Sequence, residues 1–131
     1  MLVDDSEADL LFSRIIVSRS GICDSVLEFD SAANALAHLQ APQGKDIDLI
    51  LLDINMPGMD GFEFLRAYEQ LADAHAKVVM LTSSPDPHDR LEAERFGCVR
   101  GYVVKPINLS AAQALQPLVE PPPSPSPPAT G

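Results

Sequence analysis

The stretch from residue 49 to residue 61 constrains the fold of this chain most. Four consecutive apolar residues, 49–52, end in an acid, Asp53, and a turn-forming segment with Pro57 and Gly58 follows. A short apolar run closed by Pro and Gly predicts a strand that is buried on both faces of a parallel sheet. Open α/β sheets bind their ligands at the carboxyl ends of the strands, where Asp53 would lie. Hydrophobic packing and ion pairing do not explain an acid at that place, whereas a nucleophile or a metal ligand does.

The rest of the chain alternates between strand-like and helix-like apolar patterns. Strands are predicted at 1–3, 25–30, 48–53, 77–82 and 102–104, and helices at 6–16, 31–39, 61–72, 86–96 and 110–115. Strands that alternate with helices predict an α/β fold, with a parallel sheet covered on both faces. Residues 120–131 are rich in Pro and Ser, so we expect a disordered tail there and a single domain over residues 1–119.

Composition narrows the class of protein. The chain has 131 residues, of which 46% are hydrophobic, and this fits one folded domain with one core. Its net charge is −10, from 19 acids against 9 bases, which argues against binding to nucleic acid. We find no signal peptide and no apolar stretch near the roughly 20 residues of a membrane span. Cys23 and Cys98 lack metal-ligand spacing and are typical of packing residues in a reducing cytoplasm. We therefore expect a cytoplasmic protein that binds neither nucleic acid nor a membrane.

Polar residues follow four of the predicted strands. Asp4 and Asp5 follow the first, Asp53 ends the third, Thr82 ends the fourth, and Lys105 follows the fifth. Right-handed connections place the carboxyl ends of parallel strands at the same edge of the sheet. Three carboxylates, a hydroxyl and an ammonium should therefore lie close together.

Such a group of side chains favours one kind of chemistry. Clustered carboxylates repel one another unless a cation joins them. Oxygen ligands without His or Cys favour Mg²⁺ over zinc. A metal and an ammonium together would draw in the oxygens of a phosphoryl group. The site therefore suits phosphoryl transfer to a carboxylate, with Asp53 as the nucleophile.

Taken together, these motifs resemble the receiver domain of two-component response regulators. The matching segments are residues 3–6, 53–61, 82–84 and 105–106, which occur in the order and spacing of that family. The resemblance covers about residues 1–119 and is to the single-domain, chemotaxis-type regulators. It implies a flavodoxin-like, doubly wound five-stranded parallel sheet with strand order 2-1-3-4-5 and helices on both faces.

The resemblance also assigns roles by position. It implies that Asp53 is the phosphoacceptor and a metal ligand, that Asp5 binds Mg²⁺ directly, and that Asp4 reaches the metal through water. The backbone carbonyl of Asn55 would complete the protein ligands. Asn55 and Ser84 also match positions that tune autodephosphorylation in the family.

Three further positions would respond to phosphorylation. Thr82 would move toward the phosphoryl group, Lys105 would pair with it, and Tyr102 would be the aromatic switch that follows Thr82. The bond between Lys105 and Pro106 is expected to be cis, as in relatives.

The function implied is that of a signalling switch. The donor would be a sensor histidine kinase or a histidine phosphotransfer protein, and the phosphorylated form would act on a downstream protein target. We expect a monomer or weak homodimer, no output domain in this chain, and no enzymatic activity beyond its own phosphorylation and dephosphorylation. Two alternatives are a phosphohydrolase of the haloacid dehalogenase type, which needs an Asp where Asn55 stands, and a scaffold that works without phosphate.

The chain departs from the family pattern at two places. Only three residues precede Asp4, so the first strand is either short or truncated, and we expect lowered stability. Pro117 cannot donate a helical hydrogen bond, so the last helix should stop or kink near Gln116 and alter the output face.

Overall fold

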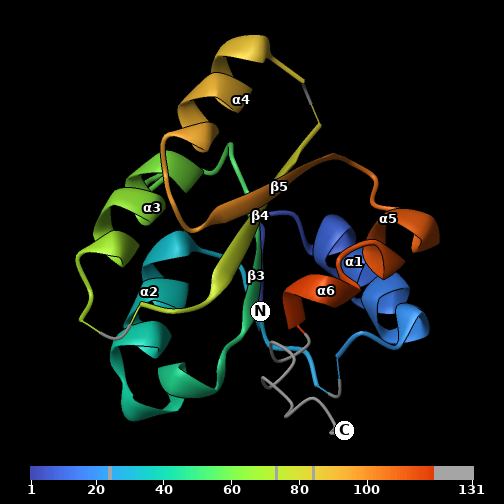
Figure 1. Cartoon of the computed structure of the whole chain (residues 1–131), viewed down its shortest axis with the longest axis horizontal. Helices are drawn as coiled ribbons and strands as arrows, with labels where there is room; N and C mark the ends of the chain where they lie inside the picture. The colour runs from blue at the N-terminus through green and yellow to red at the C-terminus, as the bar shows by residue number, and fades with distance from the viewer. Residues whose placement is uncertain (24, 73, 84, 120–131) are drawn as a thin grey trace, which may run out of the picture.

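A parallel sheet forms the centre of the molecule. The structure, a computed structural model, describes residues 1–23, 25–72, 74–83 and 85–119. Over these residues five parallel strands lie in the order β2-β1-β3-β4-β5 (Figure 1), which confirms the predicted flavodoxin-like fold class. The strands are β1 (Leu2–Val3), β2 (Glu28–Phe29), β3 (Leu49–Asp53), β4 (Lys77–Thr82) and β5 (Val99–Val104).

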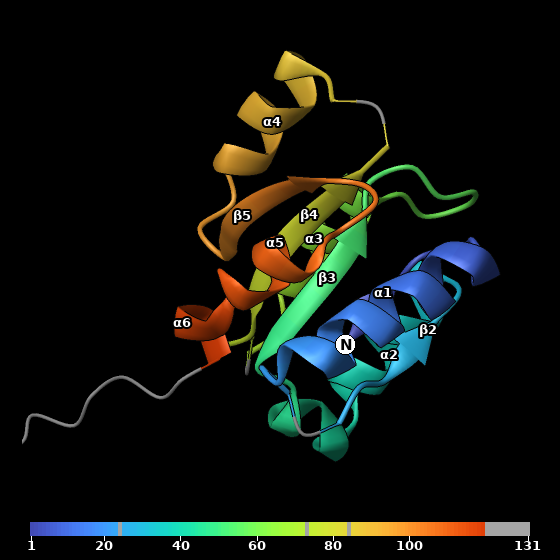
Figure 2. The same cartoon turned by 90° about the vertical axis from the view of Figure 1, so that its right-hand side faces the viewer.

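Helices cover both faces of this sheet. Figures 1 and 2 show α1, α5 and α6 on one face and α2, α3 and α4 on the other. Their bounds are α1 (Glu7–Ser20), α2 (Ala32–Gln40), α3 (Gly61–Glu69), α4 (Pro87–Glu94), α5 (Leu109–Gln113) and α6 (Gln116–Val119), with a 3-10 helix, η1 (Pro42–Asp46), between α2 and β3. This two-sided cover requires strands that are apolar on both faces.

β3 meets that requirement because all five of its residues are buried. Ile50 and Leu52 pack into the core on the α2 and α3 side, together with Leu65 and Tyr68. Leu51 belongs to the core on the α1 and α5 side. The Tyr68 hydroxyl accepts a hydrogen bond from the Ala76 N–H at 2.9 Å, so its polar end is satisfied inside the core. The sheet therefore holds the carboxyl end of β3 rigidly.

The short first strand determines the length of its neighbour. Leu2 pairs with Glu28 and Val3 pairs with Phe29. The predicted strand at 25–30 therefore shrinks to two residues, because β1 offers only two residues to pair with. Met1 still ties β1 to β3, since its carbonyl accepts the Leu51 N–H at 2.8 Å. The lowered stability expected from this short strand stays a prediction.

The start of β5 also differs from expectation, whereas the expected interruption of the last helix is present. β5, an edge strand, begins at Val99 rather than at Tyr102. The apolar pattern did not predict its first residues, because Arg100 and Gly101 interrupt that pattern. The interruption predicted near Gln116 is present, since α5 ends at Gln113 and α6 begins at Gln116.

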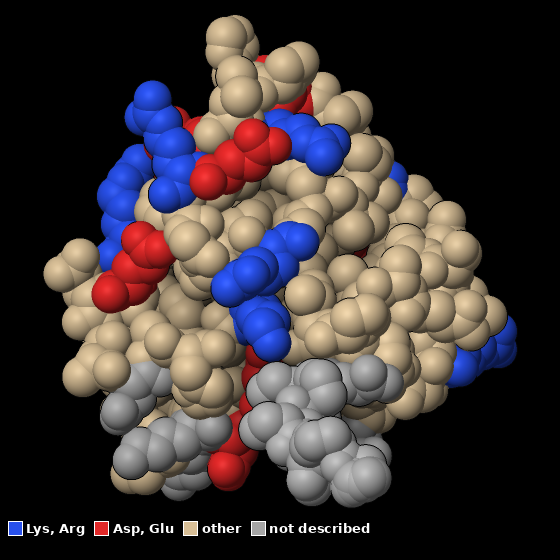
Figure 3. All heavy atoms as spheres, viewed as in Figure 1, with Lys and Arg blue, Asp and Glu red and all other residues tan. Residues whose placement is uncertain are grey.

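Ser84 and the segment 120–131 lie outside the described residues. In the part of the chain that the structure describes, no helix is long and apolar enough to cross a membrane. On the face drawn in Figure 3, Lys and Arg side chains lie at several separate places, with Asp and Glu side chains among them. This face of the acidic chain therefore presents charges of both signs.

Candidate functional site

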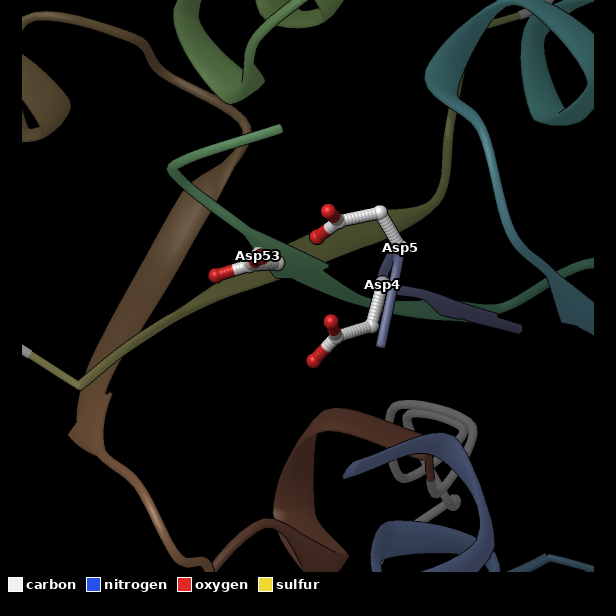
Figure 4. A group of neighbouring side chains, drawn as sticks. All are labelled: Asp4, Asp5 and Asp53. Atoms are coloured by element: carbon white, nitrogen blue, oxygen red, sulfur yellow. The ribbon is translucent and has the colours of Figure 1, made fainter. Parts of the chain in front are cut away.

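Three carboxylates meet at the carboxyl ends of β1 and β3. The register pairs Val3 with Leu52, so Asp4 follows β1 beside the place where Asp53 ends β3. Ligand atoms of Asp4, Asp5 and Asp53 all lie within 4.8 Å of one another. Figure 4 shows the three carboxylates around one shared space. Asp4 and Asp53 are buried and Asp5 is exposed, so the cluster opens to solvent on the Asp5 side.

A lysine whose side chain is mostly covered, Lys105, lies against this cluster. The Lys105 Nζ is 2.9 Å from Asp4 Oδ2, 2.9 Å from Asp9 Oδ2 and 3.4 Å from Asp53 Oδ1. Its side chain is only 10% exposed. Burial by itself lowers the pKa of Lys105, but hydrogen bonds to Asp9 and Asp4 outweigh it and raise the pKa above its ordinary value. The ammonium is therefore a fixed positive charge at neutral pH.

The candidate nucleophile, Asp53, has a raised pKa. Burial, and then the neighbouring charge of Asp4, raise the pKa of Asp53 from 3.8 to about 6, although Lys105 acts in the opposite direction. A carboxylate held this way is ionised above pH 6 and gains from any cation that approaches it.

Hydrogen bonds at the start of α1 involve both Asp4 and Asp9. Asp4 Oδ1 accepts the Ser6 N–H at 3.0 Å, and the Ser6 hydroxyl caps α1 by accepting the Asp9 N–H at 3.3 Å. Both bonds satisfy amides that have no partner inside the helix. The turn from β1 into α1 therefore fixes the Asp4 side chain and the backbone of Asp9.

Thr82 lies on the adjoining strand. Asp53 pairs with Leu81, so Thr82 is one residue beyond the neighbour of Asp53, and it is fully buried. Its carbonyl accepts the Lys105 N–H at 2.7 Å, which ties the lysine backbone to the end of β4. The peptide bond from Lys105 to Pro106 is cis.

Tyr102 lies further from the carboxylates, in β5, where it pairs with Met80. Its hydroxyl is buried with no hydrogen-bond partner among the described residues. The guanidinium carbon of Arg90 lies 5.6 Å from the centre of its ring. Asn55 is exposed in the loop after β3, and the role of its carbonyl as a metal ligand stays a prediction.

The structure thus brings Asp4, Asp5, Asp53 and Lys105 together as the sequence predicted. It also adds Asp9, which the sequence analysis did not assign. Asp9 is the third residue of α1, and it follows the N-cap Ser6 by three residues. An acid at this place is common in helices, so the sequence carries no specific signal for its contact with Lys105.

The first residue of α3, Gly61, packs closely against the backbone of Asp53 and Ile54. A Cβ added to Gly61 would lie 2.8 Å from the Asp53 carbonyl oxygen and 3.0 Å from the Ile54 Cα. Both are backbone atoms of the strand end and cannot give way without moving Asp53.

We therefore expect Gly61→Ala to lower the free energy of unfolding by about 1–3 kcal/mol, the usual cost of overpacking. Gly97→Ala is the matched control, since a Cβ there meets nothing within 4 Å, and it should change stability by less than about 0.5 kcal/mol. Urea denaturation of both variants measures the difference. Equal stability of Gly61→Ala and wild type would show that α3 does not constrain the strand end.

Comparison with known proteins identifies the family. The family model of the response regulator receiver domain matches residues 1–115. The chain is 32% identical over 123 residues to the chemotaxis protein CheY of Pseudomonas aeruginosa, covering 92% of this chain and 91% of that protein. It superimposes on the crystal structure of a two-component response regulator from Cytophaga hutchinsonii with a TM-score of 0.81 and 28% identity, covering 90% and 92% of the two chains.

The chain belongs to the response regulator receiver domain family of two-component systems. Domains of this family are signalling domains rather than ordinary enzymes, and they generally bind Mg²⁺. The chain is also 31% identical to the two-component response regulator ORR1 of Oryza sativa over 88% of its length, but it spans only 52% of that protein.

The donor set fits Mg²⁺. The three clustered side chains offer oxygen atoms only, and the buried pair of acids gains from a divalent cation. Asp4, Asp5 and Asp53 are therefore the residues of this chain that could hold the metal.

Proposed function

We propose that this chain is a phosphorylation-controlled signalling switch whose phosphoacceptor is Asp53. The observation that carries the proposal is the convergence of three carboxylates and one ammonium at a single edge of the sheet. No structural role requires two buried acids beside a third acid, since their mutual repulsion is unfavourable. A phosphoryl group and its metal give each of these charges a partner.

The residues divide the chemistry between them. A carboxylate oxygen of Asp53 attacks the phosphorus of a phosphohistidine whose other ring nitrogen carries a proton. An O–P bond forms, the P–N bond breaks, and its electron pair leaves on a neutral imidazole. Lys105 balances the charge of the phosphoryl oxygens, and the Thr82 hydroxyl donates a hydrogen bond to them. Asp4, Asp5 and Asp53, with the Asn55 carbonyl, would hold Mg²⁺, which when bound neutralises phosphoryl oxygens.

The switch follows from the new charge. An aspartyl phosphate brings a charge near −2 to the edge of the sheet, which draws Thr82 and Lys105 toward Asp53. Tyr102 would follow the movement of Thr82. Its buried hydroxyl without a partner supports this role, because such a group costs about 1–3 kcal/mol and favours a second ring position.

We further propose the setting in which this switch works. The donor is a sensor histidine kinase or a histidine phosphotransfer protein, and the phosphorylated domain binds a downstream protein target in the cytoplasm. The domain occupies residues 1–119, acts as a monomer or weak homodimer, and catalyses only its own phosphorylation and dephosphorylation.

Trapping of the modified residue tests the proposal. After incubation with phosphoramidate and Mg²⁺, borohydride reduces an aspartyl phosphate to homoserine, and peptide mapping then locates it. We expect homoserine at position 53. Homoserine at another acid, or steady release of phosphate from p-nitrophenyl phosphate, would contradict the proposal, the latter in favour of a phosphohydrolase.

A further inference from the structure

Asp9 holds the lysine of the site from outside the metal cluster. Its carboxylate lies 2.9 Å from the Lys105 Nζ, whereas the nearest contact of the same ammonium with Asp53 is 3.4 Å. Asp9 is 45% exposed at its side chain and comes from the first turn of α1. The ammonium is therefore closer to this acid than to the proposed phosphoacceptor.

Capping of α1 does not occupy the Asp9 carboxylate. An acid at the third helical position often turns back to accept the N–H of the capping residue. Here Asp4 accepts that Ser6 N–H, so the Asp9 side chain is available to Lys105. Glu7, in the same turn, supplies a second acid near the positive end of the helix dipole.

We propose that Asp9 is a positioning residue that holds the Lys105 ammonium against α1 and thereby slows phosphoryl uptake by Asp53. The inference rests on the proposed function. An incoming phosphoryl group needs the Lys105 ammonium, and Asp9 competes for it.

A bound metal would increase the share of Asp9 in the competition for the Lys105 ammonium. A cation held by Asp4, Asp5 and Asp53 would neutralise part of the charge of these carboxylates. Asp9 lies outside the group of ligands that could hold the cation, so its charge stays directed at Lys105. Asp9 therefore sets how readily the lysine turns to the phosphoryl group.

The test compares second-order rate constants for phosphorylation by phosphoramidate with Mg²⁺, followed by intact mass. Asp9→Asn keeps the shape and removes the charge, and it should react about three- to tenfold faster than wild type. Asp9→Glu retains the charge, and Glu7→Gln removes an acid from the same turn that is not among the ion-pair partners of Lys105. Both controls should react within about twofold of wild type.

A double-mutant cycle separates positioning from a general charge effect. In a Lys105→Ala background, Asp9→Asn should lose its effect, because no ammonium is left to release. The inference is overturned if Asp9→Asn is no faster than wild type, if Glu7→Gln is equally fast, or if the gain persists without Lys105. A wild-type protein that takes up no phosphoryl group would instead overturn the proposed function, and this inference with it.

Discussion

Asp53→Asn should raise the free energy of unfolding by about 3 kcal/mol at pH 7 in the absence of Mg²⁺. The reason is the pKa of Asp53, which burial and the charge of Asp4 raise from 3.8 to about 6. Above pH 6 the folded protein carries an ionised carboxylate that the unfolded chain would carry at lower cost. An amide of the same shape removes that cost, so a residue central to function should be unfavourable for stability.

The stabilising effect of Asp53→Asn should depend on pH. Below about pH 4 the carboxyl is protonated in both states, and the unfavourable contribution is absent. It grows as the pH rises from about 4 to 6 and is complete above the folded-state pKa of about 6. The advantage of Asp53→Asn should therefore appear over this interval.

Urea denaturation at pH 4, 5, 6 and 7, with and without Mg²⁺, measures these expectations. Mg²⁺ should stabilise wild type and have much less effect on Asp53→Asn, because the variant lacks one ligand charge. Glu7→Gln is the control for loss of one exposed acid. An Asp53→Asn variant that is less stable than wild type at pH 7 would show that the buried carboxylate is compensated in the resting protein.

Lys105→Ala should have the opposite effect and lower the free energy of unfolding by about 3–5 kcal/mol without Mg²⁺. The substitution leaves the carboxylates of Asp4 and Asp53 buried without their ammonium. Because the lysine side chain is only 10% exposed, solvent cannot replace its charge. Mg²⁺ should restore part of the lost stability, since it supplies positive charge to the same oxygens.

Arg14→Ala is the matched control for Lys105→Ala. Its ion pair with Glu28 has a similar length, 3.0 Å, but the two side chains are 47% and 34% exposed. Removing it should cost less than about 1 kcal/mol. Equal losses for the two variants, measured by thermal and urea unfolding, would mean that burial does not set the strength of the Lys105 contacts.

The main residues of the candidate site could be located from the sequence alone. Asp53 could be found because the apolar run before it defines a buried strand, and a general rule of α/β sheets places strand ends together. The same rule brought Asp4 and Lys105 to that edge, although 101 positions separate them along the chain. Residue type and strand position were sufficient for these positions.

Other features depend on partners that a pattern does not reveal. β2 is short because β1 offers only Leu2 and Val3 for pairing, and the isolated pattern at 25–30 could not show that limit. β5 begins early because Val99 and Gly101 both pair with β4, across a register shift that leaves Arg100 without a partner, and neither Arg100 nor Gly101 carries a strand signal in the sequence. The contact of Asp9 with Lys105 joins residues 96 positions apart, and an exposed acid in a first helical turn is unremarkable in sequence.

The most direct measurement of the central claim is the intact mass of the protein after incubation with phosphoramidate and Mg²⁺, beside Asp53→Asn and an EDTA control. We expect one added phosphoryl group on the wild-type protein, and none on Asp53→Asn or in EDTA. No added mass on a wild-type sample that is folded by circular dichroism, or equal addition to Asp53→Asn, would contradict it.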